Sequence, residues 1–194
     1  MRNVYLVIMG KTGAGKSTLV NTLIGENVAE TGTGTAVTQK NEKYTRQIVG
    51  NDGLALNLTV YDTVGLEIDN AITEKTIKDI EKHIKEVSES TFADEVTAVW
   101  FCVNWKCNRF ENYELELIKK LSVERCIPFI IVLTQCPDDS VGDLEKSICK
   151  MLPEVPVRHI LAQDYKSRVG VHKAYGLPEL LDTTINEYPR LKVH

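Results

Sequence analysis

The sequence predicts an α/β fold of three layers: a six-stranded, mostly parallel sheet with one antiparallel edge strand and helices on both faces. Short apolar runs alternate with segments of helical periodicity along the 194 residues. Between two neighbouring runs stands the turn-forming sequence Gly50-Asn-Asp-Gly53, which favours a single antiparallel hairpin. No repeat or linker-like stretch divides the chain, so we expect one domain.

The expected strands are apolar or alternating runs, at residues 4–9, 43–49, 54–62, 96–103, 127–134 and 155–162. The expected helices cover residues 16–24, 77–87 and 111–124, a segment capped by Ser140 that runs to about residue 151, and a closing helix between Pro178 and Pro189. We expect residues 163–175 to form an irregular loop. Because ligands of such sheets bind beyond the carboxyl ends of the strands, the loops that leave those ends are the candidate site.

Charge, hydropathy and cysteine content argue against several classes of protein. A formal net charge of -4 argues against a nucleic-acid binder that works through a basic face. No apolar run approaches the roughly 20 residues that cross a bilayer. The five cysteines are an odd number without the spacing of a disulfide framework, which favours a reducing compartment and hence the cytosol.

The strongest motif is Gly10-Lys-Thr-Gly-Ala-Gly-Lys16-Ser17, which matches GxxxxGK[ST] between a predicted strand and a predicted helix. Its glycines let successive main-chain N–H groups turn toward phosphate oxygens, and the following helix adds its positive dipole end. Lys16 is expected to reach the β- and γ-phosphates, while the Ser17 hydroxyl coordinates magnesium. The nucleotide-binding residues expected here are Gly13, Ala14, Gly15, Lys16, Ser17 and Thr18.

A second motif, Val60-Tyr-Asp62-Thr-Val-Gly65, ends the second strand of the predicted hairpin. Asp62 can hold the magnesium ion through water, and the Gly65 N–H can contact a γ-phosphate. The segment before the hairpin, residues 30–39, alternates threonine with glycine and could become ordered when magnesium and a γ-phosphate bind. We expect Thr38 to give its hydroxyl to the metal, with Thr35 as the alternative.

These motifs resemble those of the translation-factor-related class of GTPases. Within that class, GKTGAGKSTLVNTLIG followed by VTQ and YDTVGLE is similar to the Era-like, septin and immunity-associated GTPase groups. The resemblance implies the P-loop GTPase fold, Mg²⁺, and a switch controlled by GTP and GDP, with Lys16, Thr38 and Gly65 as the catalytic residues. It also implies a GTPase domain over residues 1–188, followed by a tail at 189–194 that could begin a linker.

The base-recognition motif of these families, [NT]KxD, is only partly present. The chain reads Leu133-Thr134-Gln135-Cys136-Pro137-Asp138, so that proline stands at the aspartate position and Asp138 comes one residue late. The resemblance assigns Thr134, Gln135 and Asp138 to the guanine site, together with Ala162 and Gln163, which resemble the SAK loop. We expect Asp138 to reach the base after a small adjustment of the loop.

Leu66 follows Gly65 where many relatives place a glutamine that orients the attacking water. Leucine cannot orient water, so we expect slow hydrolysis that a homodimer across the nucleotide or an activating protein accelerates. Two alternatives remain at this point. Leu66 is compatible with a nucleotide-gated binding module that barely hydrolyses GTP, and Pro137 is compatible with an ATP-using P-loop enzyme.

Overall fold

The protein is described here from a computed structural model, which defines residues 2–25, 42–49, 55–62, 78, 82, 96–107, 110–124, 127–138, 142–168 and 170–187. Its centre is a six-stranded sheet in the order β2-β3-β1-β4-β5-β6. Only the β2–β3 pair is antiparallel, and β2 lies at the edge. The predicted sheet is therefore confirmed. The strands are β1 (Arg2–Gly10), β2 (Glu42–Val49), β3 (Ala55–Asp62), β4 (Val96–Asn104), β5 (Phe129–Thr134) and β6 (Val157–His159).

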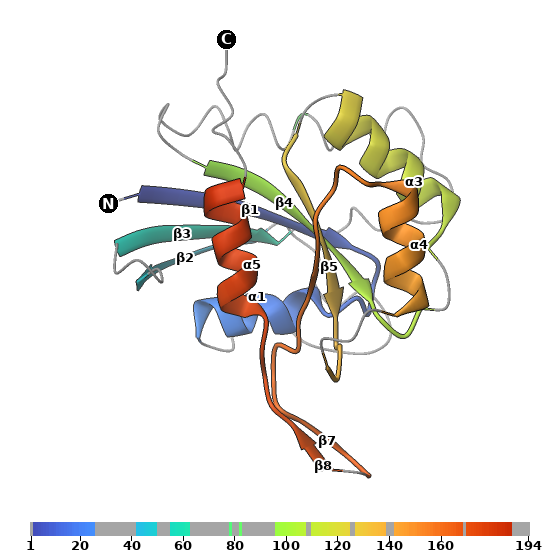
Figure 1. Ribbon diagram of the computed structural model, residues 1–194. Helices are drawn as coiled ribbons and strands as arrows, with labels where there is room; N and C mark the ends of the chain where they lie inside the picture. The colour runs from blue at the N-terminus through green and yellow to red at the C-terminus, as the bar shows by residue number, and fades with distance from the viewer. Residues whose placement is uncertain are drawn as a thin grey trace.

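Helices pack on both faces of this sheet, as Figure 1 shows. One face carries α1 (Lys16–Ile24) and α5 (Leu177–Asp182), which is continued by a π-helical turn, η2 (Thr183–Glu187). The other face carries α3 (Asn112–Ile118), its π-helical continuation η1 (Lys119–Glu124), and α4 (Asp143–Met151). A bond within the first of these layers ties the closing helices to the sheet: the indole N–H of Trp100 donates to the Thr184 hydroxyl at 2.9 Å.

The central strands supply two apolar cores because successive side chains point to opposite faces. In β1, Leu6 and Ile8 pack toward α1, whereas Val7 and Met9 pack toward α3 and η1. β5 is buried along its whole length, as expected for a strand covered on both sides. Within the described residues, no helix is long and apolar enough to span a membrane.

Several details of the predicted elements were wrong. Residues 163–175 contain a two-stranded hairpin, β7 (Tyr165–Ser167) and β8 (Gly170–His172), instead of an irregular loop. This hairpin projects beyond the carboxyl ends of the central strands (Figure 1). The last strand of the main sheet is only three residues long, and α4 begins after Gly142, so Ser140 is not its N-cap.

The helix expected over residues 77–87 lies almost entirely outside the described residues. Only Lys78 and Lys82 of that range are described, and both are helical.

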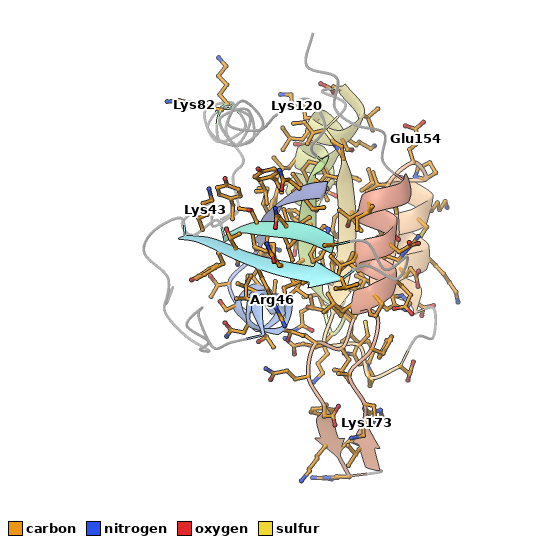
Figure 2. All side chains as sticks on the ribbon, turned by 90° about the vertical axis from the view of Figure 1, so that its left-hand side faces the viewer. Lys43, Arg46, Lys82, Lys120, Glu154 and Lys173 are labelled. Carbon is orange, nitrogen blue, oxygen red and sulfur yellow. The ribbon has the colours of Figure 1, made fainter. Side chains whose placement is uncertain are left out.

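Edge strand β2 is connected to α1 through Arg46. Its guanidinium donates to the main-chain carbonyl of Leu23 at 3.1 Å, near the end of α1, although most of the side chain is exposed. Figure 2 shows Arg46 reaching from the strand toward this helix. The contact satisfies a carbonyl of the last helical turn, where partners within the helix run out.

Candidate nucleotide-binding site

Four strand ends meet at one edge of the sheet. The pairing register places Gly10 at the end of β1 opposite Cys102 in β4, and Asn104 at the end of β4 opposite Thr134 in β5. Asp62 ends β3 and pairs with Ile8, two residues before Gly10. The sequence motifs therefore gather at the carboxyl ends of neighbouring strands, where α/β sheets bind ligands.

The segment Gly10 to Ser17, called the phosphate loop below, turns sharply at its first glycine. Gly10 has φ of +140°, and a Cβ atom added to it would lie 2.3 Å from the Cys102 carbonyl oxygen. No side chain fits at that distance, so glycine is required for the loop to leave β1 beside β4. Helix α1 then begins at Lys16 with no side-chain cap on its first N–H groups. Unpaired N–H groups at a helix N-terminus form a favourable environment for a phosphate group.

Lys16 folds back over this loop. Its Nζ atom donates to the carbonyls of Gly10 at 2.7 Å and Lys11 at 3.0 Å. The ammonium group is thereby held above the turn whose main chain is expected to surround the phosphates. That Lys16 contacts the β- and γ-phosphates remains a prediction.

Lys11, a loop residue that the sequence analysis did not single out, fastens the phosphate loop to α3. Its Nζ atom lies 3.4 Å from Glu114 Oε2 and 4.8 Å from the centre of the Tyr113 ring. The pKa of Lys11 is raised: partial burial alone would lower it, but Tyr113 and Glu114 outweigh that effect. Glu114 is 3% exposed and also accepts the Glu111 N–H, forming a capping box. No local sequence pattern marks this contact, because it depends on the burial of Glu114 and on the packing of α3 against the phosphate loop.

The loop that follows β5, residues 134–138, is predicted to recognise the base and is called the base loop below. It is bonded directly to the phosphate loop. The Thr134 hydroxyl, which is buried, donates to the Ala14 carbonyl at 2.7 Å. Gln135, the next residue, has φ of +58°, a conformation that is uncommon outside glycine. Its Nε2 atom lies close to Gly15: a Cβ atom added to that glycine would be 3.7 Å from it. The structure therefore brings Thr134 and Gln135 against Ala14 and Gly15, and their assignment to the guanine site remains a prediction.

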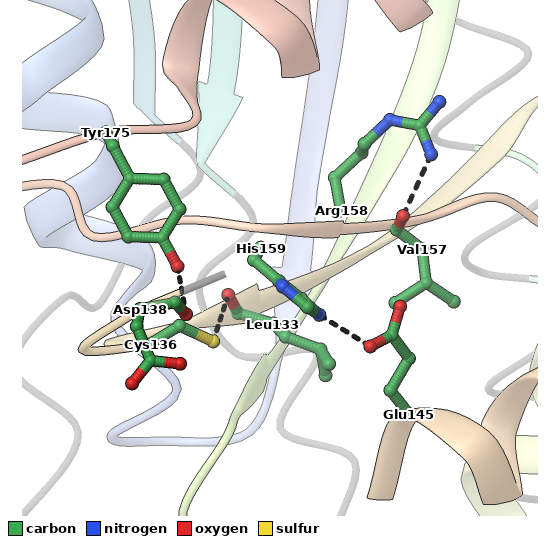
Figure 3. Close-up of polar contacts among 8 residues, drawn as sticks. All are labelled: Leu133, Cys136, Asp138, Glu145, Val157, Arg158, His159 and Tyr175. Atoms are coloured by element: carbon green, nitrogen blue, oxygen red, sulfur yellow. Dashed lines mark hydrogen bonds and ion pairs between the residues drawn. The ribbon is translucent and has the colours of Figure 1, made fainter. Parts of the chain in front are cut away.

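Cys136, the residue after Gln135, anchors the base loop through two hydrogen bonds to main-chain carbonyls. Cys136 is buried, donates its N–H to the Ile160 carbonyl at 3.2 Å, and donates its thiol to the Leu133 carbonyl at 3.3 Å (Figure 3). Burial raises the pKa of this thiol to about 12. Asp138 follows on the exposed surface. A neutral, buried thiol thus serves as a small apolar support beneath the exposed carboxylate.

The loop that resembles SAK lies next to α1. The Thr22 hydroxyl donates to the Ala162 carbonyl at 3.1 Å, a contact that the sequence analysis missed because it joins residues far apart in the chain. Gln163 is exposed, and Asp164 accepts bonds from the Ala174 N–H at 2.9 Å and the Lys173 ammonium at 2.7 Å. Ala162 and the phosphate-loop helix are therefore neighbours.

Part of the predicted site lies outside the described residues. Thr38, Thr35, Gly65 and Leu66 fall there, as does the side chain of Asp62, whose backbone ends β3. Ser17 and Thr18 are half-buried in the first turn of α1, and Gly13 is exposed. Among the described residues, no group of three or more His, Cys, Asp or Glu side chains could hold a metal ion.

Fold and site together define a P-loop nucleotide-binding domain. Residues 5–135 match the family model for the 50S ribosome-binding GTPase, and the chain belongs to this GTPase family. GTPase Era from Coxiella burnetii (strain Dugway 5J108-111) is 29% identical over 178 residues, which cover 78% of this chain and 57% of Era. The chain thus spans little more than half the length of this relative. The predicted resemblance and the assignment to the GTPases are confirmed.

Solved structures show the same fold. A variant of Era from Aquifex aeolicus bound to GDP·AlF4⁻ matches with a TM-score of 0.64 and 22% identity, over 98% of this chain and 58% of Era. Toc33 from Arabidopsis thaliana in complex with GDP and Mg²⁺ matches with a TM-score of 0.61 and 16% identity, over 98% of this chain and 87% of Toc33. Era has also been solved with MgGDPNP and nucleotides 1506–1542 of 16S ribosomal RNA; that structure matches with a TM-score of 0.62 and 21% identity, over 94% of this chain and 56% of Era. The Era structure with RNA speaks against our expectation that this chain has no nucleic-acid partner.

Proposed function

We propose that this domain binds GTP with Mg²⁺, hydrolyses it slowly, and acts as a switch controlled by the bound nucleotide. The observation that carries the proposal is the placement of Lys16, whose ammonium group is held over the phosphate-loop carbonyls of Gly10 and Lys11. In phosphoryl transfer, the Lys16 ammonium group would stabilise the negative charge on the phosphate oxygens of the transition state, and a bound magnesium ion would supply further positive charge there.

The donor set suits magnesium. Ser17 stands at the start of α1 and Asp62 at the end of β3, and the strand register brings these two elements to the same edge of the sheet. With the Thr38 hydroxyl, the set consists only of oxygen atoms, which Mg²⁺ prefers. Ser17, Thr38 and Asp62 would hold the ion, which would supply positive charge to offset that of the phosphates, while Lys16 would hold the nucleotide from the loop side.

Guanine is the base that we assign to the site. Thr134 fixes the base loop to Ala14, Gln135 lies along Gly15, and the exposed Asp138 can accept two N–H bonds from a guanine ring. Ala162, held by Thr22, borders the same region. The GTPase family match favours this assignment over an ATP-using enzyme.

Slow turnover follows from Leu66, which cannot orient water. Self-association is the activation mode that we favour. Among the matched structures is one in which dimerization is described as important for the GTPase activity of the chloroplast translocon components atToc33 and psToc159; it has 16% identity and a TM-score of 0.65 over 100% of this chain and 87% of that one. Hydrolysis per molecule should then rise with protein concentration. A concentration-independent rate would favour an external activating protein, and no turnover would favour the binding-module alternative.

We also propose that residues 1–188 form the GTPase domain, with 189–194 as a tail outside it, and that the domain works in a reducing compartment such as the cytosol. Cys102, Cys107, Cys136 and Cys149 are free thiols in the described part of the chain, which fits such a compartment.

The test compares wild type with Lys16→Ala for binding of GDP and GTP with and without Mg²⁺. Loss of the ammonium group should weaken binding by about a hundredfold or more, because a charge-assisted contact to phosphate is lost. Lys150→Ala, an exposed lysine at the end of α4, is the control and should bind as wild type does. Equal affinities for wild type and Lys16→Ala would refute the proposal.

A further inference from the structure

The hairpin β7–β8 and the residues after it contact the main chain of the base loop. Two side chains, His172 and Tyr175, reach the carbonyls of the consecutive residues Pro137 and Asp138. These carbonyls belong to the part of the loop in which the sequence departs from the GTPase pattern. The contacts join segments about 35 residues apart, so no local pattern in the sequence could reveal them.

His172 is fixed on both sides of its ring. Its Nδ1 atom lies 2.9 Å from the Pro137 carbonyl, which can only accept, so Nδ1 carries a proton and donates it. Its Nε2 atom lies 3.1 Å from the Ser167 hydroxyl across the hairpin. Both partners restrict the ring to one orientation, and the orientation of the ring in turn fixes the position of the Pro137 carbonyl.

Tyr175 connects the base loop with the SAK-like loop. Its hydroxyl donates to the Asp138 carbonyl (Figure 3), while its main chain exchanges two hydrogen bonds with Leu161, at 3.0 and 3.2 Å. Leu161 directly precedes Ala162, which Thr22 holds beside α1. Tyr175 therefore places the base loop at a set distance from the SAK-like loop and from the phosphate-loop helix.

These contacts matter because Pro137 has no carboxylate to offer a base. The only described carboxylate in this loop is that of Asp138, which points away from the Tyr175 ring in Figure 3. The direction of that side chain depends on the main-chain path through residues 137 and 138. Because carbonyls of both residues are held, that path is held as well.

We propose that Tyr175 and His172 are positioning residues for base selectivity: they fix the main chain at Pro137 and Asp138 so that the displaced Asp138 carboxylate faces the guanine ring. This inference rests on the proposed function, in which Asp138 recognises guanine. It differs from that function in assigning selectivity to two residues that do not touch the nucleotide.

The first test measures affinities for GDP and ADP on wild type and Tyr175→Phe. Removing the hydroxyl frees the Asp138 carbonyl, so the preference for GDP over ADP should fall about tenfold while the affinity for ADP stays within twofold. Tyr165→Phe is the matched control, because Tyr165 lies exposed on the hairpin that precedes Tyr175, and phenylalanine keeps its ring contacts with Lys106 and His172. An unchanged GDP preference in Tyr175→Phe overturns the inference, and so does an equal loss of both affinities, which would indicate a merely structural role.

The second test uses rescue at His172. Leucine removes the donor to Pro137 and should lower the GDP preference, whereas asparagine can still present an N–H and should restore part of it. Equal selectivity of His172→Leu and His172→Asn contradicts the positioning role.

Asp138→Ala separates the two proposals. If it abolishes the GDP preference while Tyr175→Phe leaves that preference intact, guanine recognition by Asp138 stands and the positioning role is overturned. If Asp138→Ala keeps the full preference, the assignment of Asp138 fails, and the inference falls with it.

Discussion

The Thr134 hydroxyl donates a 2.7 Å hydrogen bond to the carbonyl of Ala14, which fastens the loop after β5 to the phosphate loop. Both groups are buried, and a second carbonyl, that of Val103, lies 3.3 Å from the same hydroxyl. A single side chain thus sets the spacing between the segment expected to bind the base and the segment expected to bind the phosphates.

Replacing Thr134 with valine should test this spacing. The shape is kept, but the Ala14 carbonyl loses its partner in a buried place, which costs about 1–3 kcal/mol. Urea unfolding should show that loss in the free energy of unfolding, and GDP titration should show weaker binding. Thr134→Ser retains the hydroxyl and serves as the control. Valine and serine variants with equal stability and affinity would contradict the role.

Gly10→Ala should be far more damaging than Gly13→Ala. A Cβ at Gly10 would lie 2.3 Å from the Cys102 carbonyl, at a φ of +140°, whereas a Cβ at Gly13 meets nothing within 4 Å. We expect a loss of more than about 3 kcal/mol for the first variant and about 1–2 kcal/mol, from backbone strain alone, for the second. Thermal unfolding measures the difference. Similar melting temperatures would mean that the loop can leave β1 by another path.

Glu114→Gln should loosen the phosphate loop from α3. The variant keeps the size of a buried side chain but removes the charge that pairs with Lys11. Because the lysine is partly exposed, we expect a modest loss of about 1 kcal/mol. Glu116→Gln, on the exposed face of the same helix, should change stability by less than about 0.5 kcal/mol. A double variant with Lys11→Met should show a coupling energy, whose absence would refute the contact.

The thiols should react with iodoacetamide in a defined order. Cys107 is exposed and should react first; the pKa of Cys149 is raised by its loss of hydration and by Glu145, so it should follow. Cys136 is buried with a pKa of about 12 and should resist at pH 8 until the protein is unfolded. Mass spectrometry of the folded and denatured protein measures this order. Rapid labelling of folded Cys136 would contradict its placement.

The same thiol predicts a loss of stability at high pH. Unfolded chains release a cysteine proton near the ordinary value of 9.0, whereas folded Cys136 keeps its proton up to about pH 12. Its contribution to the free energy of unfolding is therefore complete below pH 9 and declines between pH 9 and 12. Unfolding of wild type and Cys136→Ala over that range measures the contribution of this group. Parallel pH curves for the two proteins would rule it out.

Features of the fold and site that depend on short stretches of sequence could be predicted, whereas features that depend on tertiary contacts could not. The phosphate loop and the six-stranded sheet were predictable because the glycine spacing, the lysine of the motif and the apolar runs act within short segments. The hairpin β7–β8 was missed because its strands have three residues each and are polar, too short for an alternating pattern to show. The ties through Lys11 and Thr22 were missed because they depend on tertiary contact alone. Thr38, Gly65 and Leu66 remain predictions.

The Arg46 bond to the Leu23 carbonyl has a further consequence. In sequence, the threonine residues expected at the metal, Thr35 and Thr38, stand between these two residues. The helix that precedes them and the strand that follows them are thus joined by a hydrogen bond. The edge strand cannot move away from α1 without breaking that bond, so a displacement of one element is resisted by the other.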